Sequence, residues 1–267
     1  MLSLKLLLMA LILGASALVF AMHGQGGGVL YTPIQVLFGV DFHTAATRSQ
    51  LFIVVTAFTS TIIFGRARRI DWPVAIVLEM AAATGSFFGG LHAHRFSPSL
   101  LMLVLGSAVL VAAISMLRGY VGVEDEMGSS VATWHWRRDL GGSRYVVNLI
   151  AGMPLLVLIG VVSGLTGVAG GFLKVPMMVL LFGMPIEIAF GCASFMVMLT
   201  AASGFAGHVA ASPPDWSVTL VIGIFVAIGA QIGPRITLRS DPERLQHRFA
   251  YVLFALSALI FYLSRGI

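Results

Sequence analysis

Two glycine-rich stretches contain the residue types that could bind an anion through backbone amides. Residues 23–33 read HGQGGGVLYTP, and residues 166–176 read TGVAGGFLKVP. Glycine adopts positive φ readily and leaves the backbone bare, so that N–H groups can converge on a ligand. A helix that starts directly afterwards adds free N–H groups and the positive end of its dipole. The alternative is that these glycines only allow close helix packing. The candidate residues are His23, Gly24, Gln25, Gly26, Gly27, Gly28, Thr166, Gly167, Gly170 and Gly171.

Few ionisable residues fall inside the apolar segments of the chain, and each is costly enough there to need an explanation. Glu79 lies in the interior of the segment Trp72–Leu91. Its carboxyl group could stay protonated or pair with a cation, which makes Glu79 a candidate for proton coupling. A structural pair of Glu79 with Arg48 or with a hydroxyl group is the alternative.

The other polar candidates each allow two interpretations. Arg48 and Lys174 could point at an anionic substrate, or could extend their charged groups to the membrane surface. His23 could hydrogen-bond an anion or relay a proton, or could be a buried structural histidine. Uncharged donors suit an oxyanion but also bond to their own helix backbone; they are Ser49, Gln50 and Ser194, with Thr200 and Ser203 further along the same segment. We expect no metal site and no cofactor.

The composition places these residues in a membrane protein. The chain of 267 residues is 58% hydrophobic and 10% charged, whereas soluble domains carry roughly 25% charged residues. Its mean hydropathy is +0.97. A soluble catalytic domain is therefore excluded. The net charge of +5 resides in short loops, which favours a topological signal over a nucleic-acid-binding face.

Ten apolar segments are expected to cross the membrane. Two of them, Val29–Val40 and Phe172–Met184, are short and each follows a glycine stretch, so they can cross only if that stretch adds unwound chain at membrane depth. The other eight are Leu4–Met22, Thr44–Phe64, Trp72–Leu91, Ser99–Leu117, Val146–Ser163, Ile186–Gly207, Trp216–Gly233 and Arg248–Leu263. The first could be mistaken for a signal peptide. We expect it to be retained, because 146–163 precedes the second glycine stretch in the same way.

The two glycine stretches belong to an internal repeat. Asp71-Trp72 recurs as Asp215-Trp216, 144 positions later, and other matching residues keep that offset or one residue less. Each half has five segments, an odd number, so the second half must enter the membrane upside down, as in inverted-repeat transporters. We expect an all-α integral membrane protein with two inverted five-segment repeats, each with one short broken helix after a Gly-rich stretch. The repeats are 1–118 and 146–267, joined by a cytoplasmic linker at 119–145.

The distribution of Lys and Arg predicts the orientation. If all ten segments cross, five of these residues face one side: Lys5, Arg48, Arg95, Lys174 and Arg265. Eleven face the other: Arg66, Arg68, Arg69, Arg118, Arg137, Arg138, Arg144, Arg235, Arg239, Arg244 and Arg248. The richer side should be cytoplasmic, with both termini extracytoplasmic. If neither short segment crosses, the clusters at 66–69 and 239–248 fall on opposite faces instead.

These motifs resemble the TauE/SafE family, the sulfite exporter or toluene-sulfonate uptake permease group. The resemblance rests on residues 167–176 (GVAGGFLKVP), 189–195 (AFGCASF) and 204–208 (GFAGH), echoed at 24–33 and 45–51. It implies a transporter of sulfite, sulfonates, sulfoacetate or similar small anions, coupled to ions. The chain departs from the family pattern at His23 and Gln25, and at 191–194 (GCAS), where members commonly have a Gly-Thr-Ser type of run.

The expected function is secondary transport of a small anion across a bacterial inner membrane by alternating access, with the two glycine breaks as the site. We expect no enzyme, because neither Gly-x-Ser-x-Gly nor His-Glu-x-x-His occurs. A channel-like or sensory protein is an alternative, as is a transporter of another small solute, although the few carboxylates favour an anion. The expected partners are the anion and the lipid bilayer, without nucleic acid; a homodimer is compatible with the sequence.

Overall fold

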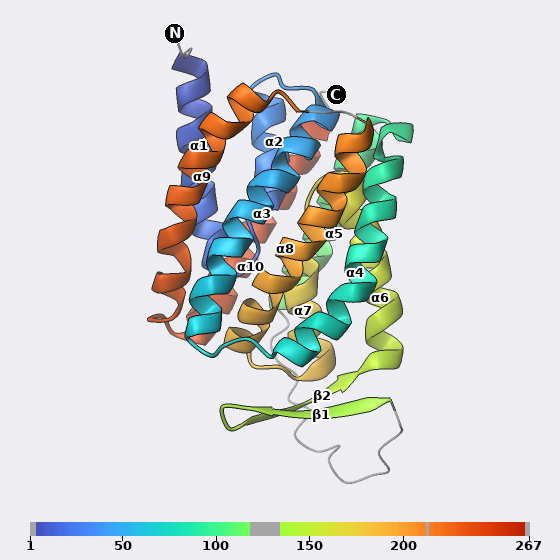
Figure 1. Ribbon diagram of the computed structural model, residues 1–267, viewed down its shortest axis with the longest axis vertical. Coiled ribbons are helices and arrows are strands. Elements are labelled where there is room, and N and C mark those ends of the chain that lie inside the picture. The colour runs from blue at the N-terminus through green and yellow to red at the C-terminus, as the bar shows by residue number, and fades with distance from the viewer. Residues whose placement is uncertain (1–3, 118–133, 212–213, 265–267) are drawn as a thin grey trace.

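The computed structural model describes residues 4–117, 134–211 and 214–264, and these residues form a bundle of ten α-helices with one β-hairpin (Figure 1). The helices are α1 Leu4–Ala21, α2 Gly28–Leu37, α3 Phe42–Arg66, α4 Trp72–His92, α5 Pro98–Leu117, α6 Leu149–Thr166, α7 Gly171–Phe182, α8 Ile186–Ala211, α9 Trp216–Thr237 and α10 Pro242–Ser264. A short 3-10 helix, η1 (Ala93–Arg95), follows α4, and β1 (His135–Leu140) and β2 (Ser143–Asn148) precede α6. Each predicted apolar segment corresponds to one of these helices.

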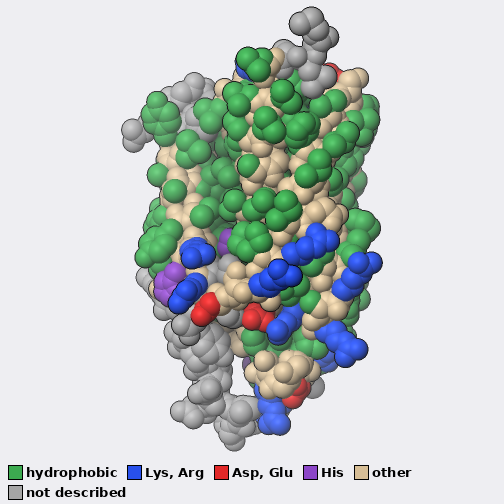
Figure 2. Space-filling model, turned by 90° about the vertical axis from the view of Figure 1, so that its left-hand side faces the viewer, with side chains coloured by type: hydrophobic (Ala, Val, Ile, Leu, Met, Phe, Trp, Pro, Cys, Tyr) green, Lys and Arg blue, Asp and Glu red, His purple; other side chains and the backbone are tan. Residues whose placement is uncertain are grey.

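Seven of the described helices are long and apolar enough to cross a membrane: α1, α3, α4, α5, α6, α8 and α9. The apolar helices α2 and α7 are shorter, as is the stretch His247–Tyr262 of α10. Large apolar side chains cover most of the face shown in Figure 2, and Met80, Leu220 and Ile224 are more than 60% exposed. Such a surface suits lipid, whose tails are as apolar as leucine. The predicted class, an all-α integral membrane protein, is confirmed.

Glycines allow two pairs of helices to touch along their backbones, α4 with α6 and α1 with α9. A Cβ atom on Gly85 of α4 would lie 2.3 Å from the carbonyl oxygen of Val157 on α6. On α9, a Cβ atom on Gly229 would lie 2.0 Å from the carbonyl oxygen of Gly14 on α1. Gly229 follows Gly85 by 144 positions, and Val157 follows Gly14 by 143. The packing thus repeats with the offset of the sequence.

The hairpin β1–β2 occupies the end of the predicted linker and extends beyond it to Asn148. The sequence analysis did not predict it. Its antiparallel strands are joined by Gly141 and Gly142, whose φ values of 61° and 84° fit the two left-handed residues of a type I′ turn. The predicted linker residues 119–133 lie outside the described residues.

Asp71, between α3 and α4, fastens the hairpin to the helices. Arg138 of β1 donates two hydrogen bonds to the Asp71 carboxylate, at 2.8 and 2.9 Å, and the Tyr145 hydroxyl of β2 donates a third at 2.5 Å. Burial raises the pKa of Asp71, but the hydrogen bonds from Arg138 and Tyr145 outweigh it and hold that pKa below its usual range. Burial and the bond to Asp71 raise the pKa of Tyr145. Asp71 also caps α4 by accepting from the Val74 amide.

The two ends of the bundle differ in charge. The start of α1 and the end of α10 lie at one end, while the hairpin and the connections α3–α4 and α9–α10 lie at the other (Figure 1). Figure 2 shows Lys and Arg side chains gathered toward this hairpin end. Of the eleven arginines predicted to share a face, Arg118 lies outside the described residues, and the others lie in or beside the hairpin and these two connections. The clusters 66–69 and 239–248 therefore share one end of the molecule.

Candidate functional site

Both short helices begin at a glycine that leaves the first amides free. The residue before α2 is Gly27 (φ 77°) and the residue before α7 is Gly170 (φ 66°), and neither helix has a side-chain cap. Within the described part of the chain, no acceptor is hydrogen-bonded to the amides of Gly28 and Gly171. Free N–H groups at a helix start, together with the dipole, favour an anion.

The first glycine stretch runs as unwound chain beside α8 to the middle of the bundle. At the hairpin end, the Thr237 hydroxyl of α9 donates to the Met22 carbonyl. A Cβ atom on Gly24 would then meet the Phe190 carbonyl oxygen, near the start of α8, at 2.0 Å, and one on Gly26 would meet Val197, near the middle of α8, at 2.9 Å. Helix α2 therefore starts near mid-height, after unwound chain.

The starts of α2 and α7 lie against each other at this level. A Cβ atom on Gly171 would be 3.1 Å from the Cα of Gln25 and 2.7 Å from Val197. A Cβ atom on Gly28 would be 3.4 Å from the Cα of Val168. The two glycine stretches, 143 residues apart in the chain, are thus in direct contact.

Two polar side chains of the first stretch have unused hydrogen-bonding atoms beside this contact. Gln25 is 3% exposed, and neither its amide nitrogen nor its amide oxygen has a partner among the described residues. His23 is buried between the rings of Phe190 and Phe249. Its Nδ1 lies 3.0 Å from the Val19 carbonyl oxygen, and its Nε2 has no partner in the described part of the chain. Buried polar groups are normally hydrogen-bonded, so these atoms require an explanation.

Lys174 forms a buried ion pair with Glu79. Lys174 Nζ lies 2.7 Å from Glu79 Oε2, and both side chains are at most 1% exposed. The ammonium also donates to the Thr200 hydroxyl, which in turn donates to the other Glu79 oxygen. Helices α4, α7 and α8 thus contribute one side chain each. The partner suggested for Glu79, Arg48, was wrong, whereas a hydroxyl partner was correctly anticipated. Extension of Lys174 to the membrane surface is contradicted, and Lys174 does not belong in the count of loop charges.

The polar residues at 48–50 of α3 have separate environments. Gln50 donates to the Ser163 carbonyl at 3.4 Å, and its amide oxygen has no partner. Ser49 accepts a hydrogen bond from Gln35 at 3.0 Å. Arg48 is 7% exposed and Nε has no partner. Gln50 alone of the three approaches α6, the helix that leads into the second glycine stretch.

Two predicted hydroxyl ligands donate to backbone carbonyls of their own helices, and Ser194 also accepts a hydrogen bond from Thr61 of α3 at 3.3 Å. Thr166 donates to the Val162 carbonyl at 2.8 Å, and Ser194 donates to the Gly191 carbonyl at 2.7 Å. Gly167 and Gly170 lie in tight packing, where added Cβ atoms would meet Ala46 at 2.4 Å and Ser163 Oγ at 2.1 Å. Among the described residues, no group of three His, Cys, Asp or Glu side chains could hold a metal ion.

Comparison with known proteins identifies the family. The model of the family Sulfite exporter TauE/SafE matches residues 8–260. The chain belongs to the TauE/SafE family. It is 22% identical over 250 residues to the Probable membrane transporter protein YunE of Bacillus subtilis, covering 90% of this chain and 91% of that protein. A Probable membrane transporter protein of Xylella fastidiosa is 23% identical over 248 residues, covering 90% and 89% of the two chains. Probable membrane transporter protein MJ0441 of Methanocaldococcus jannaschii is 22% identical over 249 residues, covering 87% and 86%. No solved structure matches. This TauE/SafE chain is therefore a multi-pass membrane transporter.

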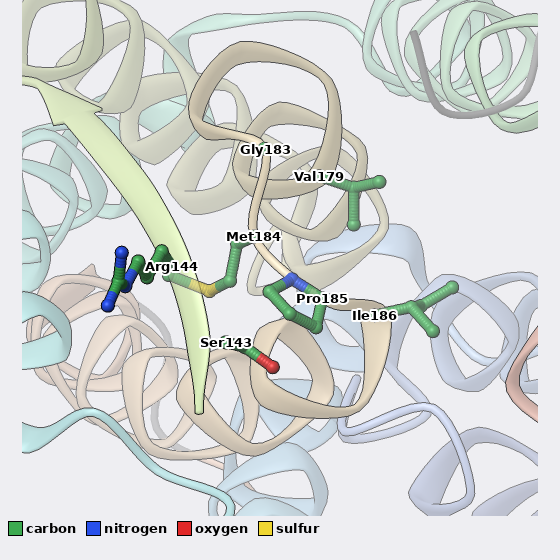
Figure 3. A pocket seen from close by; sticks show the side chains of 7 residues that line it. All are labelled: Ser143, Arg144, Val179, Gly183, Met184, Pro185 and Ile186. Carbon is green, nitrogen blue, oxygen red and sulfur yellow. The ribbon is translucent and has the colours of Figure 1, made fainter. Parts of the chain in front are cut away.

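Two cavities lie at opposite ends of the TauE/SafE bundle, each beside the last residues of a short helix. One of about 350 Å³ lies between the hairpin and the connection from α7 to α8 (Figure 3), and Arg144 and Ser143 supply its polar side chains. The other, of about 250 Å³, lies at the end with the termini and is lined by Lys5, Arg48 and Phe38 among others. Both cavities thus combine a basic side chain with an apolar wall.

Two contributors to this TauE/SafE architecture were not predicted from the sequence. The hairpin could have been found from Gly141-Gly142 between two polar and apolar runs, which is a recognised turn signal. Asp71 was singled out as part of the repeat, but its role as anchor for Arg138 and Tyr145 depends on contacts between residues 67 and 74 positions apart.

Proposed function

We propose that this TauE/SafE chain is a secondary transporter of a small organic or sulfur-containing anion, such as sulfite, a sulfonate or sulfoacetate. The anion binds where the starts of α2 and α7 meet. The chain works by alternating access in the cell inner membrane, with the hairpin on the cytoplasmic side, and its movement of the anion is coupled to an ion.

The contact between the two helix starts carries this proposal. Uncapped amides of two helices converge at mid-height of the bundle, and anions are stabilised at such positions. The buried amide of Gln25, with both polar atoms unused, lies against Gly171 and supplies a donor for an oxyanion. The broken helices of known transporters bind substrate in this manner.

The basic cavities at both ends support movement of the anion through the bundle. Arg144 lines one cavity and Lys5 and Arg48 line the other. Positive charge at a cavity mouth raises the local concentration of anions. Rocking of the helices would then open the central site to each cavity in turn.

Flux into proteoliposomes tests the proposal. The purified protein is reconstituted, and uptake of labelled sulfite and of a short alkanesulfonate is measured under proton and sodium gradients. We expect saturable uptake of at least one anion. Gln25→Leu should raise KM about tenfold or more, because a hydrogen bond to a charged group contributes about 1.5–3 kcal/mol.

Gln231→Leu is the matched control, because Gln231 lies on an exposed face of α9. Gln231 is not part of the proposed anion site. This variant should transport like the parent protein. The proposal is rejected if neither anion moves under any gradient, or if Gln25→Leu and Gln231→Leu give the same KM.

A further inference from the structure

The ion pair of Lys174 and Glu79 has a neutral counterpart in the other half of the chain. Tyr31 precedes Lys174 by 143 positions and Thr56 precedes Thr200 by 144. The Tyr31 and Thr56 hydroxyls lie 2.9 Å apart, just as Lys174 bonds to Thr200. The position that corresponds to Glu79 is occupied by a glycine, Gly223.

The neutral pair in the first half shows that a short helix can be joined to its neighbour without an ion pair. A neutral hydroxyl pair joins α2 to α3 in the first half, so joining the short helix to its neighbour does not require charge. A buried ion pair often stabilises no more than a neutral replacement, because desolvation offsets the attraction. Ionisable side chains inside membrane spans are therefore functional candidates. The charge of Glu79 and Lys174 calls for a role that Tyr31 and Thr56 lack.

The ion pair lies one helical turn from the proposed anion site. The Lys174 amide donates to the carbonyl of Gly170, the residue directly before α7. Thr200 lies three residues beyond Val197, which packs against the glycines of both stretches. Lys174 is thus the one basic residue of the described helix α7, and it lies one turn from the free amide of Gly171.

We propose that Glu79 binds the proton that is carried with the anion, while Lys174 exchanges its contact with Glu79 for a contact with the anion. This inference rests on the proposed function. In the empty site, the ammonium and the carboxylate neutralise each other. When an anion enters, a proton from water binds to a Glu79 oxygen, and the ammonium, which keeps its own protons, pairs with the anion. The net charge of the site stays the same, so that one proton accompanies each anion.

Other titratable groups around Glu79 are already engaged. The described helix α6, which packs along α4, carries no titratable side chain, and α7 carries only Lys174. On α8, Glu187 pairs with Arg69, Cys192 contacts the backbone of Asp71, and His208 bonds to the Gly164 carbonyl. On α4 itself, His92 bonds to the Phe88 carbonyl. Glu79 and Lys174 are therefore the titratable side chains that face one another here.

Simultaneous measurement of anion and proton movement tests the inference. Proteoliposomes hold a pH-indicating dye in weak buffer and receive an inward gradient of whichever labelled anion the parent protein transports. We expect the interior to acidify in proportion to uptake, and an inward proton gradient to drive accumulation of the anion. Protein-free vesicles correct for anion and protons that cross the bilayer without the protein.

Glu79→Gln keeps the shape of the side chain and imitates the protonated form. This variant should still exchange internal for external anion. Under a proton gradient, it should accumulate at least tenfold less anion than the parent protein. Thr56→Val, which breaks the neutral pair, is the matched control and should keep proton-driven accumulation. Should Glu79→Gln fail to fold, proton uptake on anion binding to the purified parent protein still decides the question.

The outcomes separate the two proposals. Absence of anion uptake by the parent protein rejects the proposed function. Anion uptake without acidification, or anion binding without proton uptake, rejects the coupling role of Glu79 and leaves the transport function standing. If Glu79→Gln accumulates the anion under a proton gradient as well as the parent protein does, the coupling role of Glu79 is also rejected.

Discussion

At the scale of single residues, the glycines before α2 and α7 combine a left-handed backbone with a lack of space. Gly170 has φ 66°, and a Cβ atom there would lie 2.1 Å from Ser163 Oγ and 3.0 Å from Ile159. Gly141 in the hairpin turn has a similar φ of 61°, but a Cβ atom would meet nothing within 4 Å. Alanine substitutions at these two positions therefore distinguish the free-energy cost of the left-handed backbone from the free-energy cost of a steric clash.

Gly170→Ala should abolish transport while Gly141→Ala should preserve it. Both variants carry the penalty of about 1–2 kcal/mol for a left-handed alanine, and Gly170→Ala also displaces the start of α7. Uptake by proteoliposomes and thermal unfolding in detergent measure the two effects, with membrane insertion checked by the yield of purified protein. Equal transport by both variants would contradict the role of Gly170.

The sequence identifies polar residues in the interior of the bundle more readily than it identifies their partners. Glu79, Lys174 and Gln25 stand out because charge or amide groups are rare in apolar segments. The pairing of Glu79 with Lys174 could not be deduced, because the two are 95 residues apart and helical periodicity within one segment carries no information on which segments touch. Arg48 was an equally plausible partner on charge alone.

At the scale of elements, the hairpin is held by one carboxylate that receives three hydrogen bonds. Asp71→Asn removes the charge opposite Arg138, so we expect a loss of about 2–4 kcal/mol of stability at neutral pH. Asp139→Asn is the control, because Asp139 lies 3.6 Å from Arg144 and both side chains are exposed. This variant should change the stability by less than about 0.5 kcal/mol.

The same contact predicts a pH dependence. Because the pKa of Asp71 is lower in the folded protein than in the unfolded chain, its stabilising contribution is complete above the unfolded value of about 3.9. It disappears as the pH falls through the lower, folded value. Thermal unfolding of the parent protein and of Asp71→Asn should therefore converge in strong acid and differ at pH 7. A constant difference across this range would show that the carboxylate charge is not responsible.

At the scale of the whole molecule, the helical segments and their number follow from hydropathy, because a chain in lipid must satisfy its backbone within each helix. The offset between Asp71 and Asp215 predicts a duplication, and the matched contacts of Gly85 and Gly229 agree with it. The contact between the two helix starts was also anticipated from the glycine stretches. The contact of Gln25 with Gly171 could not be predicted from the sequence, because it depends on how the two halves of the chain pack against each other.

The arginines at the hairpin end predict that this end faces the cytoplasm, because cytoplasmic loops retain Lys and Arg. Cys192 is the single cysteine of the chain and is buried, so Cys192→Ala gives a background for labelling. In that background, Ser97→Cys places a thiol at an exposed position between η1 and α5, and Asp139→Cys places one on the exposed face of the hairpin. A membrane-impermeant maleimide applied to intact cells should label Ser97→Cys, and should label Asp139→Cys only after the membrane is opened. The opposite pattern would reverse the orientation, and labelling of both positions in intact cells would mean that the population inserts in both directions.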